Sequence, residues 1–197
     1  VRDHGAAGDG KSIDTEAIGK AIDGCAAAGG GQVLFPPGTY LSGTIILKSG
    51  VTLFLSAGAR LVGTSDLAAY RNFEPPSDTP EGKWPRWHRA LILGIDVERV
   101  GIAGTGTIDG NKVFDPKGEE RMRGPHTIII ALSRDITIRD VAIVDSANYA
   151  VLLEHCRGVD IHGVKFTGGW DGVHFRGWPD RPCTDVTIVG CRFFTGD

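Results

Sequence analysis

The chain has 197 residues and a formal net charge of −3, from 24 acidic and 21 basic side chains. One domain of this size can bury a substantial core, and the slightly acidic balance argues against a nucleic-acid-binding surface, which is normally basic. No long apolar run occurs, so no membrane-spanning helix is expected. The 29 glycines, about twice the usual share, lie between short β-branched runs, which is typical of many tight turns between strands.

A helix is the first regular element that the sequence predicts. Asp14 is a favourable N-cap residue, the helix runs to about Ala27, and glycines 29–31 end it. One face of this helix is apolar at helical spacing: Ala17, Ile18, Ala21, Ile22 and Cys25. An amphipathic helix before a series of strands is suited to cover the open end of stacked strands.

Short strands follow the helix, separated by proline- and glycine-containing turns. The expected strands are Gln32–Phe35, Thr44–Leu47, Val51–Leu55, Arg60–Val62, Ala90–Leu93, Val100–Ile102 and Thr107–Ile108. Two polar segments interrupt them: a first excursion over residues 66–89 and a second over residues 111–124. No linker is visible, so we expect a single domain over residues 1–197.

The last third of the chain holds three copies of one pattern. The copies begin at Ser133, Cys156 and Cys183, which are 23 and 27 residues apart, a period expected of a solenoid with stacked coils. Four apolar columns align: Ile136, Val159, Val186; Ile138, Ile161, Ile188; Val141, Val164, Cys191; and Ile143, Phe166, Phe193. The alternation of inward apolar and outward charged residues predicts a right-handed parallel β-helix, an all-β fold with an N-terminal α-helical cap.

The main alternative fold is a leucine-rich repeat. A leucine-rich repeat would need its Leu-x-x-Leu-x-Leu frame and a helix in each turn, and neither is present. The four cysteines lack metal-binding spacing; packed thiols are expected, and a Cys183–Cys191 bridge stays open.

Three stretches carry a resemblance to a known family. The opening VRDHGAAGDGKSIDTEAIGKAI, the GTGTIDG stretch near residue 107, and the coil SRDITIRDVAIVDSANYAVLLEHC resemble polygalacturonase-type glycoside hydrolases (glycoside hydrolase family 28), within the pectin-lyase-like β-helix superfamily. The resemblance covers essentially the whole chain. It implies a secreted or periplasmic enzyme that acts on a polysaccharide.

The same resemblance implies which carboxylates are catalytic. The family's Asn-Thr-Asp-Gly matches residues 169–172, keeping Asp171 and Gly172 but losing Asn and Thr. Thr195-Gly196-Asp197 matches the approach to an Asp pair, with Asp197 as its first member. The family's remaining catalytic groups fall beyond residue 197, so the chain is expected to be the N-terminal part of a longer catalytic domain, and inactive alone.

The coil register supports this pair independently. Counted from their coil starts, Asp171 and Asp197 occupy nearly the same position, so two carboxylates are expected on one edge of adjacent coils. Glycosidic cleavage needs one carboxyl group to protonate the leaving oxygen and one to activate water. The resemblance assigns these roles to Asp197 and Asp171 and implies inversion. Stacked carboxyls about 5 Å apart would instead indicate retention.

Substrate contacts are predicted around this pair. Trp170 could stack on a sugar face, and Tyr149 is a further predicted substrate contact. His174, Arg176 and Arg181 could hold a uronate carboxylate. Asn148, in the column of Asp171 one coil earlier, could bond sugar hydroxyls or be a structural residue. His174 stands where the family commonly has Asp, and Leu152 where bacterial members often have His. Weaker candidates precede the first copy: Arg123 and His126.

The predicted function is hydrolysis of a pectic galacturonan with no metal or cofactor, and with no nucleic-acid or membrane partner. One rival is a β-helix polysaccharide lyase that holds Ca²⁺ through Asp171 and Asp197 and uses Arg176 as its base. The other is a non-catalytic carbohydrate-binding or adhesive β-helix.

Overall fold

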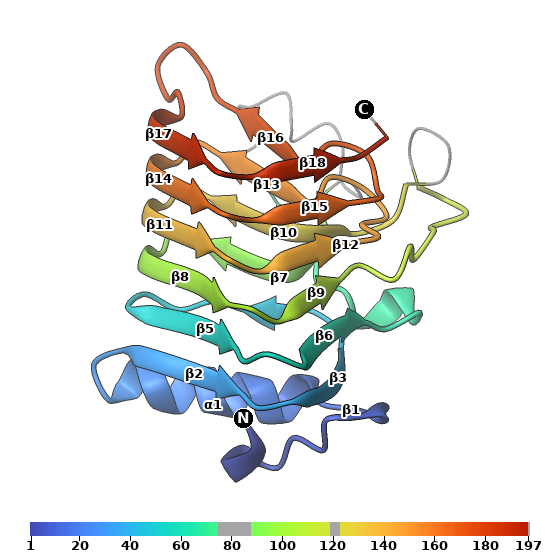
Figure 1. Ribbon diagram of the computed structural model, residues 1–197. Coiled ribbons are helices and arrows are strands. Elements are labelled where there is room, and N and C mark those ends of the chain that lie inside the picture. The colour runs from blue at the N-terminus through green and yellow to red at the C-terminus, as the bar shows by residue number, and fades with distance from the viewer. Residues whose placement is uncertain (75–87, 119–122, 197) are drawn as a thin grey trace.

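The computed structural model describes residues 1–74, 88–118 and 123–196, and its strands stack in three parallel sheets (Figure 1). Sheet A contains β1 (Asp9–Ile13), β3 (Gly38–Ser42), β6 (Ala59–Gly63), β9 (Thr107–Asp109), β12 (Ala142–Val144), β15 (Lys165–Thr167) and β18 (Arg192–Phe194). Sheet B contains β2 (Gly31–Phe35), β5 (Val51–Leu55), β8 (Glu98–Gly104), β11 (Arg134–Arg139), β14 (Arg157–His162) and β17 (Thr184–Val189). Sheet C contains β4 (Ile45–Ile46), β7 (Ala90–Ile95), β10 (His126–Ala131), β13 (Val151–Glu154) and β16 (Val173–Arg176).

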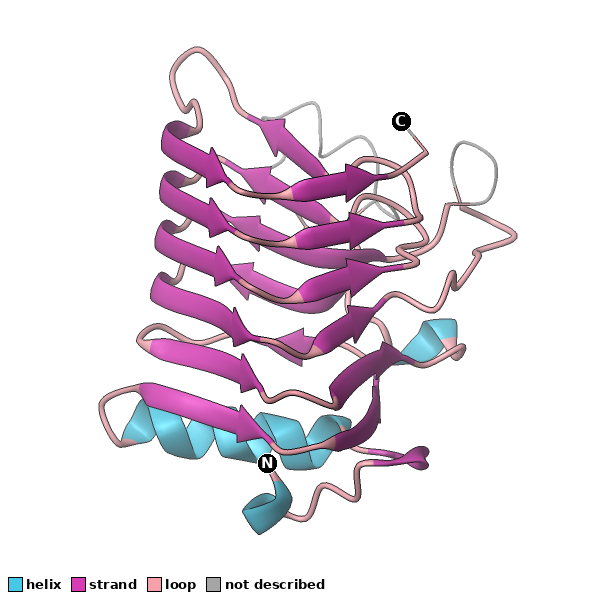
Figure 2. Ribbon diagram, in the orientation of Figure 1, coloured by secondary structure: helices cyan, strands magenta, loops and turns pink. Residues whose placement is uncertain are grey.

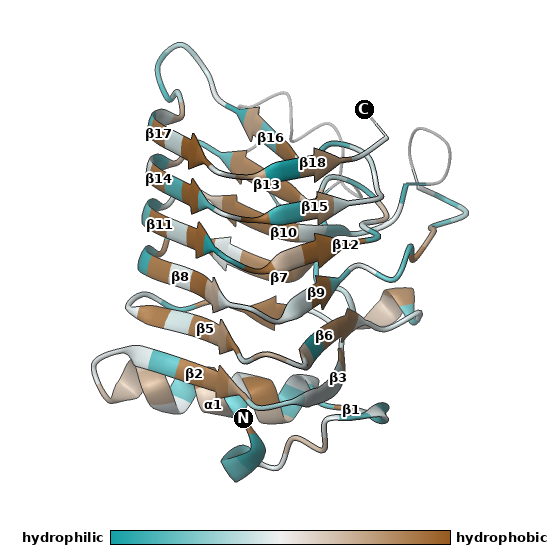
Figure 3. Ribbon diagram, in the orientation of Figure 1, coloured by the Kyte–Doolittle hydropathy of each residue, from teal (hydrophilic) through white to brown (hydrophobic). Residues whose placement is uncertain are grey.

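Each coil passes through sheet B, then sheet A, then sheet C, so neighbours in a sheet come from successive coils (Figure 2). This is the predicted parallel β-helix. The three-copy alignment is confirmed in the strand register: Ile138 pairs with Ile161, which pairs with Ile188. Ile143 pairs with Phe166, and the rings of Phe166 and Phe193 stack with centroids 4.7 Å apart. Figure 3 shows hydrophobic residues recurring at equivalent places of successive strands.

The predicted cap is helix α1 (Thr15–Ala27), preceded by the short 3-10 helix η1 (Arg2–His4). Ile18, Ala21 and Ile22 of α1 are buried against the first coils. Asp14 stands at the N-cap, but its carboxylate makes no helix cap; it accepts hydrogen bonds from the Ala7 and Gly8 amides instead. No helix in the described part of the chain is long and apolar enough to cross a membrane.

Strands β1 and β3 were not among the strands that the sequence predicted. Asp9–Ile13 forms β1, which pairs with β3 (Gly38–Ser42). Every residue of β1 is exposed, so it lacks the apolar alternation by which strands are recognised. Its strand state depends on pairing with β3.

The corners between sheets depend on left-handed backbone conformations. At the entrance to sheet B, four residues in register have positive φ: Arg99, Asp135, Gly158 and Asp185, at 53°, 57°, 67° and 54°. Asp and Gly tolerate this conformation better than most residues. The same corner thus recurs in the four successive coils that contain β8, β11, β14 and β17.

Gly104, in the GTGTIDG stretch, illustrates why that motif needs glycine. Its φ is 106°, and a Cβ at this position would collide with the carbonyl oxygen of Leu55 in the coil below. The motif therefore lets two coils approach closely at the end of sheet B.

The final strands β17 and β18 have no coil above them among residues 123–196. Ile188 is 39% exposed and Phe193 is 50% exposed, whereas their partners Ile161 and Phe166 one coil below are fully buried. The apolar columns thus reach the surface at this end.

The sulfur atoms of all four cysteines are free, so the Cys183–Cys191 bridge that the sequence left open does not form. Cys156 is fully buried, and Cys183, Cys191 and Cys25 are partly buried against the core. Packing accounts for these thiols, as the sequence predicted. Burial raises the pKa of the Cys156 thiol to about 12.

We expect Gly104→Ala to lower the free energy of unfolding by about 2 kcal/mol or more, because alanine is strained at this φ and its Cβ meets backbone. Gly19→Ala is the matched control: it lies in α1 with open space around it, so it should stabilise by up to about 1 kcal/mol. Urea unfolding of both variants measures the difference. Equal effects would contradict the close approach at Gly104.

Alkylation with iodoacetamide at pH 8 should modify Cys25, Cys183 and Cys191 in the native protein and leave Cys156 unmodified, because its thiol is buried and stays protonated. Peptide mass spectrometry locates the label, and denatured protein supplies the fully labelled control. Protection of both Cys183 and Cys191 without reductant would instead indicate a bridge.

Candidate functional site

The outer face of sheet C presents several of the side chains that the sequence singled out. Along β13, Leu153 enters the core, whereas Leu152 belongs to a second apolar cluster on the opposite face. The register pairs Leu152 with His174 and Glu154 with Arg176. Because side chains alternate along a strand, His174 and Arg176 of β16 both project from this outer face.

Asp171 precedes β16 and is joined to His174. The Nδ1 atom of His174 lies 2.6 Å from Oδ2 of Asp171. An ionised carboxylate only accepts hydrogen bonds, so in that state the imidazole N–H donates. The Asp171 and His174 side chains are 26% and 31% exposed, so the pair is fixed in place yet open to solvent.

The ring of Tyr149 packs against the His174 member of this pair. The two rings stack with centroids 4.2 Å apart and an interplanar angle of 13°. The His126 ring lies 5.2 Å from Tyr149 on the other side. Three successive strands of sheet C or their leading turns thus supply one connected set of rings beside Asp171. His126, a weak candidate in the sequence, belongs to this set but is itself buried.

Trp170 is partly exposed and adjoins the same set, but one of its faces is covered. The guanidinium carbon of Arg123 lies 4.0 Å from the Trp170 ring centroid and 5.5 Å from that of Tyr149. Arg123 comes from the second excursion, so a segment distant in sequence contributes to this surface. Sugar stacking on Trp170 would have to use its other face.

Asn148 differs from its expected place. It is 1% exposed; its Nδ2 donates to the Gly124 carbonyl and its Oδ1 accepts from the Tyr149 amide. The Ala150 amide donates to the Asp171 carbonyl, which sets Asp171 beside Tyr149 rather than beside Asn148. The register is therefore one residue off at this turn, and the geometry favours the structural alternative for Asn148.

Asp197 lies outside the described residues, so its pairing with Asp171 stays a prediction. The preceding residue, Gly196, donates its amide to the Gly169 carbonyl over 3.1 Å. The last described turn therefore stacks on the turn that leads to Asp171.

A buried polar group missed by the sequence lies at the other end of β13. Glu154 is 1% exposed, with Nη1 of Arg176 and Nε2 of His88 lying 3.6 Å and 3.4 Å from its Oε1. Glu154 and Arg176 occupy nearly equivalent positions in their coils, so the repeat alignment could have paired them. His88 comes from the first excursion, and no sequence signal places it here.

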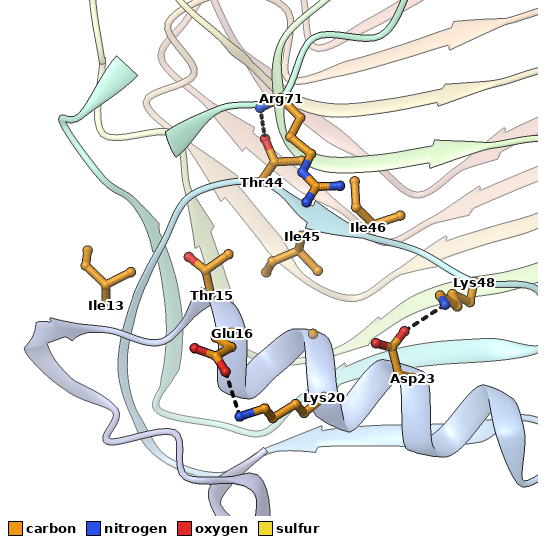
Figure 4. A pocket seen from close by; sticks show the side chains of 11 residues that line it. Ile13, Thr15, Glu16, Lys20, Asp23, Thr44, Ile45, Ile46, Lys48 and Arg71 are labelled. Atoms are coloured by element: carbon orange, nitrogen blue, oxygen red, sulfur yellow. Dashed lines mark hydrogen bonds and ion pairs between the residues drawn. The ribbon is translucent and has the colours of Figure 1, made fainter. Parts of the chain in front are cut away.

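A hollow of about 710 Å³ lies at the far end of sheet C, between α1 and β4 (Figure 4). Its charges are paired locally: Lys20 Nζ lies 2.7 Å from Glu16, and Lys48 Nζ lies 2.8 Å from Asp23. Strands β7, β10 and β13 separate it from β16, and none of the predicted site residues lines it. The hollow is thus separate from the candidate site.

Within residues 1–74, 88–118 and 123–196, no group of three or more His, Cys, Asp or Glu side chains could hold a metal ion. Asp171 and His174 form a pair without a third ligand of that kind among these residues.

Residues 1–192 match the family described as "Rhamnogalacturonase A/epimerase, pectate lyase-like". The chain belongs to this family. Polygalacturonases are among its relatives, as the motifs predicted: a "Probable polygalacturonase" from Vitis vinifera is 29% identical over 210 residues, covering 99% of this chain and 42% of that protein.

The chain is also similar to a binding protein and to a solved exopolygalacturonase structure. Plasmin and fibronectin-binding protein A of Streptococcus pneumoniae is 31% identical over 178 residues, covering 85% of this chain and 24% of that protein. The structure of a hyperthermoactive exopolygalacturonase from Thermotoga maritima superposes with a TM-score of 0.75 at 19% identity, covering 100% of this chain and 52% of that one. The chain thus spans less than half the length of the Vitis vinifera and Streptococcus pneumoniae proteins.

Proposed function

We propose that the protein is a secreted or periplasmic glycoside hydrolase that cleaves a pectic polysaccharide, with a galacturonan as substrate. The observation that carries this proposal is the solvent-accessible Asp171 carboxylate, held by His174 on a face that also presents Tyr149, Trp170 and Arg176. Membership of a family with polygalacturonase relatives supports it. A positioned carboxylate beside aromatic rings and a guanidinium is suited to an acidic sugar.

Asp171 would act as the base and Asp197 as the acid. Asp197 donates its proton to the glycosidic oxygen as the bond from that oxygen to the anomeric carbon breaks, and water attacks the carbon from the opposite face. Asp171 accepts the proton that this water loses. The two carboxyls would stand about 6.5–9.5 Å apart, the separation typical of inversion.

His174 would orient the base. Its hydrogen bond occupies Oδ2 of Asp171, which leaves Oδ1 available for the attacking water. Stacking on Tyr149 limits rotation of the imidazole, so the carboxylate is held in one orientation. This arrangement replaces the Asp that the family commonly has at position 174.

A second function is adhesive binding without turnover, which the similarity to a plasmin- and fibronectin-binding protein favours. Sugar binding by a protein that releases no reducing ends would support it. A Ca²⁺-dependent lyase would differ from both, because EDTA would abolish its activity and its unsaturated product would absorb ultraviolet light.

Replacing Asp171 by Asn in the complete protein should lower turnover of polygalacturonate on the order of 10²–10⁴-fold, because the amide cannot accept the proton from water. Stability should change by less than about 1 kcal/mol, since Asp171 lies outside the apolar columns. Oligogalacturonate affinity should hold or increase, because a charge that repels the substrate is removed.

Asp160→Asn is the matched control for that experiment, because Asp160 is an exposed acid on sheet B. Reducing-end assays, melting temperature and calorimetric affinity are measured on the same preparations. Unchanged turnover of Asp171→Asn would make Asp171 a turn residue, and lost turnover with a collapsed melting temperature would give it a structural role.

The chain spans 42% of the length of the polygalacturonase relative, and we further propose that residues 1–197 do not by themselves hold every group that cleavage needs. Residues 1–197 alone should then be inactive on pectin, and they should aggregate more than the complete protein because Ile188 and Phe193 are exposed. Reducing-end release and light scattering measure both properties. Robust turnover by residues 1–197 would contradict the assignment.

A further inference from the structure

An ion pair joins the two excursions to each other. Arg89, the last residue of the first excursion, pairs with Asp115 of the second, and their side chains are only 15% and 6% exposed. The backbone of Arg89 is itself fixed, because it forms an antiparallel bridge with Asn72 and its carbonyl accepts the His126 amide over 2.8 Å. Asp115 is therefore attached to the stack where the first excursion rejoins it.

Asp115 also organises the second excursion around itself. Its Oδ2 faces Arg89, while its Oδ1 accepts the Lys117 amide over 2.9 Å. Its carbonyl accepts the Gly118 amide over 2.8 Å, which closes a turn. Gly118 lies so close to the carbonyl oxygen of Arg123 that a Cβ would collide with it. The turn that Asp115 holds thus packs directly on the backbone of Arg123.

Arg123 is placed by this packing over the ring of Trp170. Its guanidinium carbon lies 4.0 Å from the Trp170 ring centroid, and its Nη1 donates to the Tyr149 hydroxyl over 3.4 Å. The next residue, Gly124, meets the Val113 carbonyl so closely that a Cβ would collide there as well. A guanidinium over an indole face is attracted by the quadrupole of the ring, so Arg123 restricts how Trp170 can turn.

The orientation of Trp170 matters because of where the ring stands. Trp170 directly precedes Asp171 and occupies the position at which the motif Asn-Thr-Asp-Gly has Thr. An indole offers a flat apolar face, which is suited to the C–H groups of a sugar ring. A ring that is already held in its binding orientation loses less conformational entropy when a ligand binds than one that rotates freely. With one face on Arg123, Trp170 has the other face to offer.

We propose that Asp115 is a positioning residue: with Arg89 it anchors the second excursion, so that Arg123 holds Trp170 as a stacking surface for a sugar ring beside Asp171. The two excursions then act together on one side chain of the regular coils. This inference rests on the proposed polysaccharide substrate, but it concerns how the sugar is held and not how its bond is cleaved.

A first test needs no sugar. Asp115→Asn in the complete protein should make tryptophan fluorescence more sensitive to quenching by acrylamide, because an indole released from Arg123 is more accessible. The chain has four tryptophans, so the change is assigned by repeating the comparison in a Trp170→Phe background. There, Asp115→Asn should leave the quenching unchanged.

A second test measures binding and turnover of a defined sugar. Asp115→Asn should weaken the affinity for trigalacturonate about fivefold, the loss expected when one guanidinium–indole contact no longer orders the ring. KM for polygalacturonate should rise by a similar factor while kcat stays within about twofold, because Asp171 and His174 are untouched. Removing a negative charge would by itself favour an anionic sugar, so a loss of affinity identifies a positional effect.

Asp23→Asn is the matched control, since it breaks the ion pair with Lys48 at α1, away from the site. It should leave the affinity unchanged. Arg123→Gln should reproduce the loss of Asp115→Asn, and the double variant should lose little more, because both act through Trp170. Arg123→Gln with its own quenching measurement also provides the answer if Asp115→Asn melts below the assay temperature.

Unchanged quenching and affinity in Asp115→Asn and Arg123→Gln would overturn the inference, as would full additivity of the two substitutions. Failure of the proposed hydrolase function appears differently, as an absence of reducing ends from the parent protein. In that case a loss of trigalacturonate affinity in Asp115→Asn would still support the inference, and an unchanged affinity would still overturn it.

Discussion

The hydrogen-bonded register between successive coils is the constraint on which the rest of this structure depends. Each strand pairs in parallel with the strand one coil below, so every residue belongs to a column that runs along the stack. Inward columns must be apolar because their members, such as Ile138 and Ile161, lie in one continuous core. Outward columns are free of that demand, and one of them carries the candidate site.

The two excursions are compatible with this register because they leave and rejoin the stack at corners. The first lies between β6 and β7 and the second between β9 and β10, so neither interrupts a strand. Each returns a residue to the outer face of sheet C: His88 near Glu154, and Arg123 against Trp170 and Tyr149. The site is thus built partly by the regular coils and partly by segments that lack the repeat.

Fold and function are only loosely linked in such a solenoid. Chains similar to this one include a probable polygalacturonase and a plasmin- and fibronectin-binding protein, so similarity over the β-helix does not by itself decide the activity. For this chain, the outward Asp171–His174 pair and the neighbouring Arg176–Glu154 pair distinguish the face on sheet C from the paired surface charges at α1. The proposed carbohydrate chemistry therefore rests on this face.

The sequence alone determined the β-helix, the cap helix and the inward columns, because each follows from a local period that repeats at every coil. It missed β1, whose exposed residues have no such period, and misplaced Asn148 by one residue because a turn can absorb a shift that strands cannot. Only the tertiary structure brought His88 to Glu154 and Arg123 to Trp170, since the excursions that carry His88 and Arg123 have no register of their own. The partnership of Asp171 with His174 likewise needed the structure, because it depends on how the turn before β16 directs a carboxylate toward the strand that follows.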